Sequence, residues 1–250
     1  MKDLTFDAYA KIYDSFYTDK DYQQECINLI KIAKSITSTL NYGLEIGAGT
    51  GAFTKELAKL VKHIEAYEIS ENMAKICASN LESLVDIKVT NGDLSDILES
   101  TLVKNSADIV IANFNVFSYF SSDEIDLFVQ ICRKLLRSGG VVCFDFWDLH
   151  AVVLNPPKKV IKVAHYLNRE IERRAVPKIS EDFREIDVVF EFYESSNLLF
   201  KESHMMYPKT LAEVIGYFGD SYEYHGSYDI SSGEKFSEKS YGRLVYFQKL

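Results

Sequence analysis

The amino-acid sequence predicts an α/β protein built on a doubly wound, mostly parallel β-sheet. Two observations carry this prediction. Apolar strand-like runs alternate with helical patterns from residue 42 to residue 147, which is the order expected when helices connect parallel strands. The first of these runs leads into three glycines at every second position, Gly47, Gly49 and Gly51. A strand, a glycine turn and a helix together present backbone amides and a helix N-terminus to a ligand.

The first 41 residues have a helical pattern that is rich in Tyr and Phe. Apolar side chains recur at helical spacing through this part of the chain. Two readings stay open for Tyr13 and Tyr22: packing in the core, or covering a bound ligand, since a buried tyrosine has an apolar ring and a hydroxyl that needs a partner. Residues 1–41 are therefore predicted to form an N-terminal helical lid.

The glycine turn fits two kinds of nucleotide cofactor. Gly47-x-Gly49-x-x-Ala52 satisfies the dinucleotide pattern if alanine is allowed at the third position, which is a weak signal by itself. Glu45, just before the turn, would repel a pyrophosphate and attract an α-ammonium group. Glu68 ends the next apolar run, about 20 residues after the first glycine, where a carboxylate can accept both hydroxyls of a ribose. These two acids favour S-adenosylmethionine over NAD, and a purely structural turn is the third alternative.

The remaining elements of the parallel sheet follow in order. Strands are predicted at 64–67, 86–89, 107–112 and 141–146, after the first strand at 42–46. Helical patterns cover 53–64, a segment opening at Glu71 with Ser70 as N-cap, and 123–136, the last ended by Ser138-Gly139-Gly140. The run at 107–112 is almost wholly apolar, as expected of a parallel strand covered on both faces.

Ligands of open α/β sheets lie beyond the carboxyl ends of the strands, so the side chains there are the predicted binding residues. Asp93 follows the third strand and is either an acceptor for an adenine amine or a turn residue. Met73 either contacts an adenine face or fills the core. The segment 113–120 should border the reacting group. The predicted cofactor-binding residues are Tyr13, Tyr22, Glu45, Gly47, Ala48, Gly49, Glu68, Ile69, Met73, Asp93, Leu94 and Asn113.

The pattern changes after residue 147. Strand-like runs with interleaved charges at 160–167, 183–193 and 198–206 have no helical period between them, so residues 150–206 are predicted to be an inserted antiparallel meander. A helix at 209–218 and two aromatic strand runs, at 222–224 and 243–248, follow. With a polar loop at 231–240, they make residues 207–250 a closing helix and hairpin of the main sheet.

Composition argues against several classes of protein. A net charge of −9 argues against nucleic acid as the main substrate, because phosphate binding needs concentrated Lys and Arg. The four cysteines are far apart and no His, Asp and Glu set has metal-ligand spacing, so reduced thiols and no metal are expected. No apolar run reaches 18 residues and the acidic start lacks an apolar stretch, which predicts no membrane span, no signal peptide and a cytoplasmic location.

The stretch LEIGAGTGAFTKEL (44–57), with YEIS at 67–70, looks like the first two motifs of class I S-adenosylmethionine-dependent methyltransferases. The chain as a whole resembles bacterial methyltransferases of nucleotide-linked amino sugars, through IYDSFYTDKDY at 12–22, the GDL step and KESH at 201–204. The resemblance implies a seven-stranded Rossmann-like sheet with its cofactor core at 42–147, S-adenosylmethionine as cofactor, and a nucleotide-linked sugar as acceptor. Related enzymes of surface-polysaccharide synthesis, some acting on a hydroxyl, also fit.

One position departs from the sugar enzymes. After the fourth strand they carry a histidine that faces the substrate amine, and this chain has Tyr119 there. Tyr119 then positions the acceptor, or the acceptor differs, or the ring only packs. Methyl transfer requires a positioned nucleophile and, for a hydroxyl, a general base. His204 is the first candidate for that base, ahead of Tyr119 and Asp145, with His150 a weaker one.

Three other functions stay open at this point. They are a methyltransferase for an unrelated small metabolite, a nicotinamide-dependent oxidoreductase, and a non-catalytic S-adenosylmethionine-binding protein. The oxidoreductase would leave Glu45 and Asp93 without a role. A small molecule is the expected partner in each case, and the free edge of the inserted sheet is compatible with a homodimer.

Overall fold

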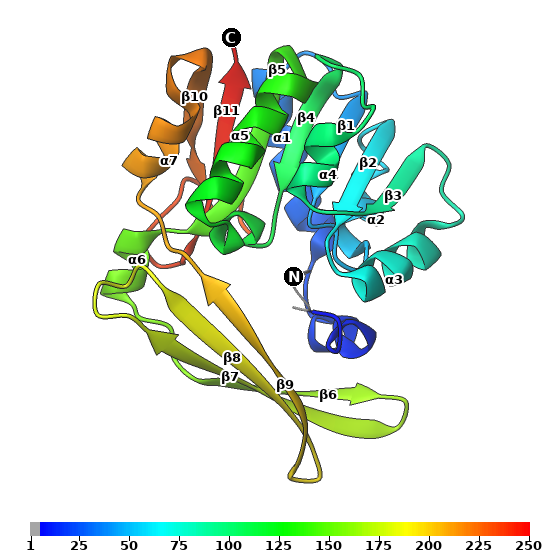
Figure 1. The fold of residues 1–250 in the computed structure, drawn as a ribbon, viewed down its shortest axis with the longest axis vertical. Coiled ribbons are helices and arrows are strands. Elements are labelled where there is room, and N and C mark those ends of the chain that lie inside the picture. Colours follow the sequence, from blue (N-terminus) through cyan, green and yellow to red (C-terminus); the bar gives the residue numbers. More distant parts are fainter. Residues whose placement is uncertain (1–5) are drawn as a thin grey trace.

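A computed structural model describes residues 6–250 of the chain, so the first five residues of the predicted lid lie outside the described part. Figure 1 shows two sheets, one above the other. The larger has seven strands in the order β10-β11-β5-β4-β1-β2-β3. Its strands are β1 (Tyr42–Ile46), β2 (His63–Glu68), β3 (Ile87–Asn91), β4 (Ala107–Ala112), β5 (Leu136–Trp147), β10 (Tyr222–Tyr228) and β11 (Gly242–Lys249). The predicted fold class is confirmed.

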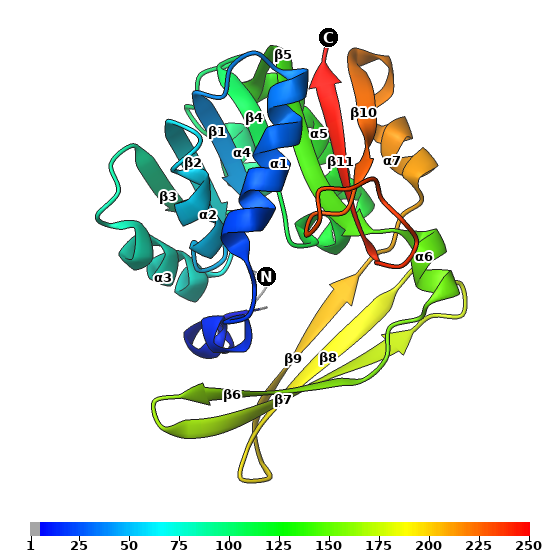
Figure 2. The ribbon, with the colours of Figure 1, turned by 180° about the vertical axis from the view of Figure 1, so that it is seen from behind.

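Helices cover both faces of the large sheet. They are α1 (Tyr22–Ile36), α2 (Ala52–Leu57), α3 (Glu71–Leu81), α4 (Leu94–Glu99), α5 (Ser122–Leu135) and α7 (Leu211–Phe218), whereas α6 (Leu149–Leu154) packs on the second sheet. Buried side chains of α1, α2 and α3 form one core with the sheet, and those of α4, α5 and α7 form the other (Figures 1 and 2). Every residue of β4 is buried, because this central strand is covered on both sides.

The strand order places the switch point of the sheet between β1 and β4. From β1 the chain moves outward through β2 to β3, and from β4 it moves the other way to β5, all in parallel pairing. The hairpin of β10 and β11 closes the edge in antiparallel pairing, as predicted. Such a switch point leaves a crevice beyond the strand ends where ligands bind.

Two predicted boundaries are wrong. The helix after the glycine turn ends at Leu57, and the Leu60 and Val61 amides donate to the Leu57 carbonyl in turns that lead into β2. The apolar side chains of Leu60 and Val61 continue the helical spacing, which is why the sequence predicts a longer helix. Ser138-Gly139-Gly140 does not cap α5 but lies inside β5. A Cβ at Gly140 would be 2.9 Å from the Arg137 carbonyl, so glycine there serves the register shift between β4 and β5.

The insertion is the second sheet, with four antiparallel strands instead of the three predicted. They are β6 (Val160–Tyr166), β7 (Arg169–Ile179), β8 (Ile186–Glu194) and β9 (Asn197–Met206). β7 escaped prediction because charged residues fill its first half; one of them, Arg173, is buried and donates to the hydroxyls of Tyr9 and Tyr17. The entrance and exit of the insertion are hydrogen-bonded together, through Lys209 N to Trp147 O and Leu149 N to Lys209 O.

The N-terminal segment lies between the two sheets, as Figures 1 and 2 both show. It has two short 3₁₀ turns, Ala10–Ile12 and Asp14–Phe16, where a longer helix was expected. Tyr9, Ile12 and Phe16 pack on apolar side chains of β6, β7 and β8. On its other side, Asp7 accepts from Ser70 Oγ, at the start of α3, and Asp14 accepts from Thr50 Oγ1 of the glycine turn. Across residues 6–250, no helix is both long enough and apolar enough to cross a membrane.

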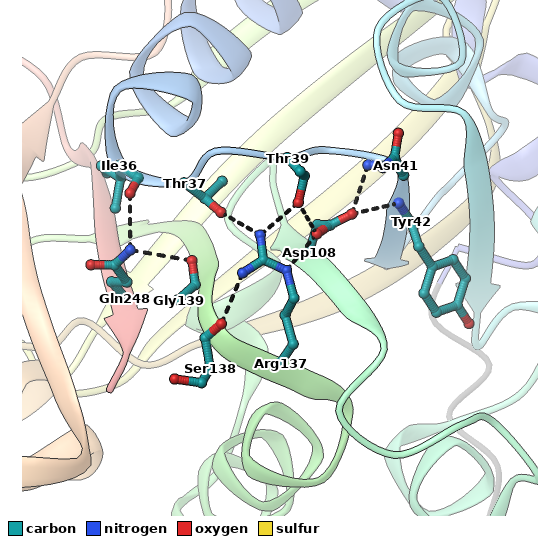
Figure 3. A network of polar contacts seen from close by, with 10 residues as sticks. All are labelled: Ile36, Thr37, Thr39, Asn41, Tyr42, Asp108, Arg137, Ser138, Gly139 and Gln248. Carbon is teal, nitrogen blue, oxygen red and sulfur yellow. Dashed lines mark hydrogen bonds and ion pairs between the residues drawn. The ribbon is translucent and has the colours of Figure 1, made fainter.

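A polar network fixes the opposite, amino-terminal edge of the strands (Figure 3). The buried Asp108 carboxylate of β4 accepts from Arg137 Nε at 2.6 Å and from the Tyr42 amide at 3.0 Å. It also accepts from Thr39 Oγ1 and the Asn41 amide, while the Arg137 guanidinium reaches Thr37, Thr39 and the Ser138 carbonyl. Nearby, Gln248 Nε2 of β11 donates to the Ile36 and Gly139 carbonyls. The network connects α1, β1, β4, β5 and β11.

Asp108→Asn is expected to lower the free energy of unfolding by about 1–3 kcal/mol at neutral pH, since hydrogen bonds to a charged group are lost. Burial alone would raise the pKa of Asp108, but the bonds from Thr39, Arg137 and the two amides outweigh it and lower this pKa. Because the folded pKa is below the unfolded one, the stabilisation is present above the unfolded pKa and lost as the pH falls through the folded pKa. Denaturant unfolding at neutral and acidic pH measures this. The exposed Asp126→Asn is the control, and equal stability of the two variants would contradict the prediction.

Candidate active site

A cavity of about 400 Å³ lies where the carboxyl ends of β1, β2 and β4 meet the second sheet. One wall comes from the glycine turn after β1 and from the end of β2. A second wall is the segment after β4, which includes Phe114, Val116 and Tyr119. β9 and the residue after it supply Ser203, Met205 and Tyr207, and the N-terminal segment adds Phe6 and Tyr13. Both sheets therefore contribute to one cavity at the switch point.

The glycine turn exposes backbone to this cavity. Gly47, Gly49 and Gly51 all have positive φ, at 77°, 58° and 84°, a conformation that glycine adopts without steric cost. The Gly47 and Ala48 amides both donate to the Tyr67 carbonyl, which ties the turn to β2. A Cβ at Gly47 would be 2.5 Å from Val116 Cγ2, whereas one at Gly49 would meet no atom within 4 Å. Glycine is required at position 47 because a Cβ there would clash with Val116, whereas Gly49 faces open space.

Glu68, the last residue of β2, lines the cavity and accepts hydrogen bonds that hold the glycine turn in place. Its Oε2 accepts from the Gly49 amide at 2.8 Å and its Oε1 from the Ser70 amide at 2.9 Å. Burial raises the pKa of this carboxyl, and the amides of Ser70 and Gly49 oppose the rise. A carboxylate has about four lone-pair sites, so both oxygens can still accept a further bond from the cavity side.

The structure brings most of the predicted binding residues together. Tyr13, Tyr22, Gly47, Ala48, Gly49, Glu68, Ile69 and Met73 all line the cavity. Met73 sits at the start of α3, whose N-cap is Ser70 as predicted. The roles assigned to these residues remain predictions, because their position in the wall does not say what they bind.

Four predicted residues do not line the cavity. Asp93 is an N-cap: its side chain accepts from the Ser95 and Asp96 amides, and its own amide donates to the Asp96 carboxylate. Leu94 is packed in the core. Glu45 and Asn113 are buried at the ends of β1 and β4. Burial raises the pKa of Glu45 to about 7. Within the described part of the chain, Glu45 Oε2 and both polar side-chain atoms of Asn113 have no hydrogen-bond partner.

Of the four residues predicted as candidates for catalysis, Tyr119 lines the cavity and the other three do not. Tyr119 lines the cavity, whereas His204 is 1% exposed and lies behind it, with Nδ1 at 3.2 Å from the Tyr119 hydroxyl. Asp145 is buried away from the cavity, where its Oδ1 accepts from the Asn115 amide and burial raises its pKa to about 7. His150 is exposed on α6 and pairs with Glu238.

Sequence reasoning missed part of the wall. Ser203 and Met205 line the cavity on either side of His204, and their alternation along β9 was the only signal that could have indicated them. Phe114 and Phe120 lie in the segment expected to border the reacting group, but neither was singled out. Phe114 has a positive φ of 61°, which a bulky residue rarely adopts and which no sequence pattern indicates.

Residues 44–140 match a protein-family model described as a methyltransferase domain. The chain therefore contains a methyltransferase domain. The matched range includes the glycine turn, Glu68 and the segment after β4, so the methyltransferase domain predicted from these motifs is confirmed for residues 44–140. S-adenosylmethionine is the methyl donor of this class, and solved structures similar to this chain include one with that cofactor bound.

Curated relatives match parts of this chain. Phosphoethanolamine N-methyltransferase 1 of Zea mays is 34% identical over 133 residues, which are 50% of this chain and 24% of that protein. The dTDP-3-amino-3,4,6-trideoxy-alpha-D-glucopyranose N,N-dimethyltransferase of Streptomyces venezuelae is 25% identical over 142 residues, 56% of this chain and 57% of that one. The chain thus spans about a quarter of the length of the maize protein and somewhat over half of the other.

Solved structures match over nearly the whole chain. An S-adenosylmethionine-dependent methyltransferase from Clostridium acetobutylicum ATCC 824 has a TM-score of 0.77 at 15% identity, covering 98% of each chain. A sugar N-methyltransferase from Streptoalloteichus sp ATCC 53650 has a TM-score of 0.76 at 16% identity, covering 96% of this chain and 93% of the other. At such identities these matches establish the fold of the whole chain, including the inserted sheet.

The residues of the cavity fit an adenosyl cofactor. Glu68 offers carboxylate oxygens at the wall, as a ribose with two free hydroxyls requires. Gly49 leaves room for close approach to the backbone. Ile69 and Met73 add apolar surface suited to an adenine face. These features lie side by side in the methyltransferase domain.

Proposed function

We propose that this protein transfers a methyl group from S-adenosylmethionine to an amine or hydroxyl of a nucleotide-linked sugar used in surface-polysaccharide or secondary-metabolite synthesis. The observation that carries the proposal is the cavity with two unlike ends. The glycine turn and Glu68 form one end, and the segment after β4 with β9 forms the other. A two-substrate transfer requires both partners to be held together in one site.

At the cofactor end, Glu68 accepts the ribose hydroxyls, while Ile69 and Met73 flank the adenine. When bound, S-adenosylmethionine supplies a methyl group on a positively charged sulfur, which is already a good leaving group. The chain itself therefore has to position the acceptor, exclude water and remove one proton. Phe6, Tyr13 and Phe114 supply apolar cover for this purpose.

The charge of the wall supports a sugar at the acceptor end. Among the described residues that line the cavity there is no Lys or Arg, and the two charged ones are Glu68 and Glu124. A phosphate group placed inside would lack a cationic partner, which is costly away from water. A hydroxyl or an amino group suits the same wall, where Tyr119, Ser203 and Tyr207 offer hydroxyls. The proposal thus places the sugar inside and the phosphates of the nucleotide outside.

The first test is calorimetric titration of the purified protein with S-adenosylhomocysteine, with NADH as the control. We expect binding of the first and none of the second. S-adenosylhomocysteine formation is then measured with S-adenosylmethionine and a panel of nucleotide-linked amino and neutral sugars. Phosphoethanolamine is included because the maize relative is named for it.

The outcomes separate the alternatives. Turnover of a nucleotide-linked sugar supports the proposal. Turnover of phosphoethanolamine alone would replace it with another small-metabolite methyltransferase. Binding of S-adenosylhomocysteine with no product from any acceptor favours a non-catalytic binding protein. Binding of NADH instead would overturn the cofactor.

A further inference from the structure

Three polar side chains form a hydrogen-bonded chain that starts at the acceptor wall of the cavity. The Tyr119 hydroxyl is 3.2 Å from His204 Nδ1, and His204 Nε2 is 3.2 Å from Glu202 Oε2. Tyr119 lies in the 3₁₀ turn that follows β4 of the large sheet, whereas His204 and Glu202 lie on β9 of the inserted sheet. The chain of contacts therefore runs from the cavity into the second sheet.

In this series of hydrogen bonds, His204 and Glu202 are shielded from water. The side chain of His204 is 0% exposed and that of Glu202 is 8% exposed. Phe6 and Phe190 pack edge-on against the His204 ring, at centroid distances of 4.4 and 4.7 Å. Since the ring is enclosed by aromatic side chains, Tyr119 and Glu202 are the protein groups placed to satisfy its two nitrogens.

Glu202 is held in place by the N-terminal segment. Its Oε2 accepts from the Phe6 amide and its Oε1 from the Tyr9 amide, both at 3.0 Å. These fixed donors point the carboxylate at His204 Nε2. A carboxylate can only accept, so the shared hydrogen belongs to Nε2. In the neutral ring His204 Nδ1 then carries a lone pair, and the hydrogen between it and Tyr119 comes from the tyrosine hydroxyl.

We propose that Tyr119, His204 and Glu202 form a proton relay that serves the acceptor. The inference rests on the proposed methyl transfer. As the acceptor nitrogen or oxygen bonds to the methyl carbon and the methyl–sulfur bond breaks, the acceptor loses its proton to the Tyr119 oxygen. Tyr119 passes its own proton to His204 Nδ1, and the Glu202 carboxylate stabilises the imidazolium. The proton leaves to solvent after product release.

In this relay Tyr119 is the catalytic residue, because it faces the acceptor. His204 and Glu202 act through it and are positioning residues. The assignment explains how a chain with tyrosine after β4 can still use a histidine for the reaction. Asp145, the other buried acid near this segment, does not reach the cavity and accepts from the Asn115 amide instead.

The first experiment reads the relay without any acceptor. Protein with ¹⁵N-labelled histidine is studied by NMR, and the His204 signals are identified with His204→Gln. We expect the neutral ring to carry its proton on Nε2, and Tyr119→Phe to shift the Nδ1 resonance. A proton on Nδ1, or an Nδ1 resonance unaffected by Tyr119→Phe, would overturn the relay.

The second experiment uses the acceptor found in the panel above. Tyr119→Phe and His204→Gln are each expected to lower kcat by about 10²–10⁴-fold, the usual contribution of acid–base catalysis. The double variant should be no slower than the slower single one, because groups acting as a unit are not additive. Affinity for S-adenosylhomocysteine should not change. Glu202→Gln keeps the side-chain shape but removes the charge, and it should also lower kcat.

Controls separate this proposal from the proposed function. His165→Gln alters an exposed histidine of β6 and should leave kcat and the His204 resonances unchanged. Full kcat in Tyr119→Phe or His204→Gln would overturn the relay while leaving methyl transfer standing. If the wild type methylates no acceptor, the proposed function fails, and the NMR experiment still decides whether the relay is assembled.

Discussion

Gly49→Ala is expected to weaken S-adenosylhomocysteine binding by about 5- to 150-fold, because one extra methyl pressed against the bound ligand costs about 1–3 kcal/mol. Its Cβ meets no protein atom within 4 Å, so the methyl would project into the space left for the ligand. The folded protein should lose only about 1–2 kcal/mol, the cost of positive φ for a residue with a Cβ.

Gly47→Ala is the matched variant, two residues away in the same turn. Its Cβ would lie 2.5 Å from Val116 Cγ2, at a φ of +77°. Backbone strain and overpacking together should cost about 2–5 kcal/mol of stability. For a protein of this size, that lowers the melting temperature by roughly 5–20 °C.

Calorimetric titration and thermal unfolding of both variants measure the contrast. Gly49→Ala should be impaired in binding and should lose less stability than Gly47→Ala. Wild-type affinity in Gly49→Ala would mean that the turn is not the contact surface of the cofactor. The open space at Gly49 would then need another explanation.

Glu68→Ala is expected to weaken S-adenosylhomocysteine binding by about 5- to 150-fold, equivalent to 1–3 kcal/mol for lost bonds to a charged acceptor. The effect has two sources in the structure. The carboxylate can accept from the ribose, and it also holds the Gly49 and Ser70 amides that shape the turn. Both are lost in the alanine variant.

Glu65→Ala is the control, since Glu65 lies on the same strand and pairs with Lys88 away from the cavity. Glu68→Gln separates the two sources, because the amide still offers one oxygen to the turn but presents donors to the ribose. Titration of all three variants is the measurement. An unchanged affinity in Glu68→Ala would refute the ribose assignment.

The cofactor side of the site could be predicted because it is local in sequence. A strand, three glycines and a helix fix their own geometry, and Glu68 follows from the end of the next strand. Asp93 shows the limit of this reasoning. An acidic residue just past a strand can face a ligand or cap the next helix, and Asp96 three residues later completes a capping box.

The acceptor side could not be predicted in the same way, because distant segments form it. Ser203 and Met205 reach the cavity only through the position of the inserted sheet. Arg173 made β7 look unlike a strand, because its buried guanidinium donates to the hydroxyls of Tyr9 and Tyr17, more than 150 residues earlier in the chain. The position of the Glu202 carboxylate is likewise fixed by distant residues, because the Phe6 and Tyr9 amides donate to it. Such pairings leave no periodic signal.

The hydrogen bonds between Trp147, Leu149 and Lys209 close the stem of the inserted sheet. A segment whose two ends meet can vary in length or sequence without separating the strands that carry the cofactor. The Asp108 network holds those strands at the far edge and shares no residue with the insertion. The insertion can therefore be exchanged as a unit, provided that the N-terminal segment that packs on it is exchanged with it. Exchanging it for the equivalent segment of another methyltransferase should transfer acceptor choice while the donor site stays the same.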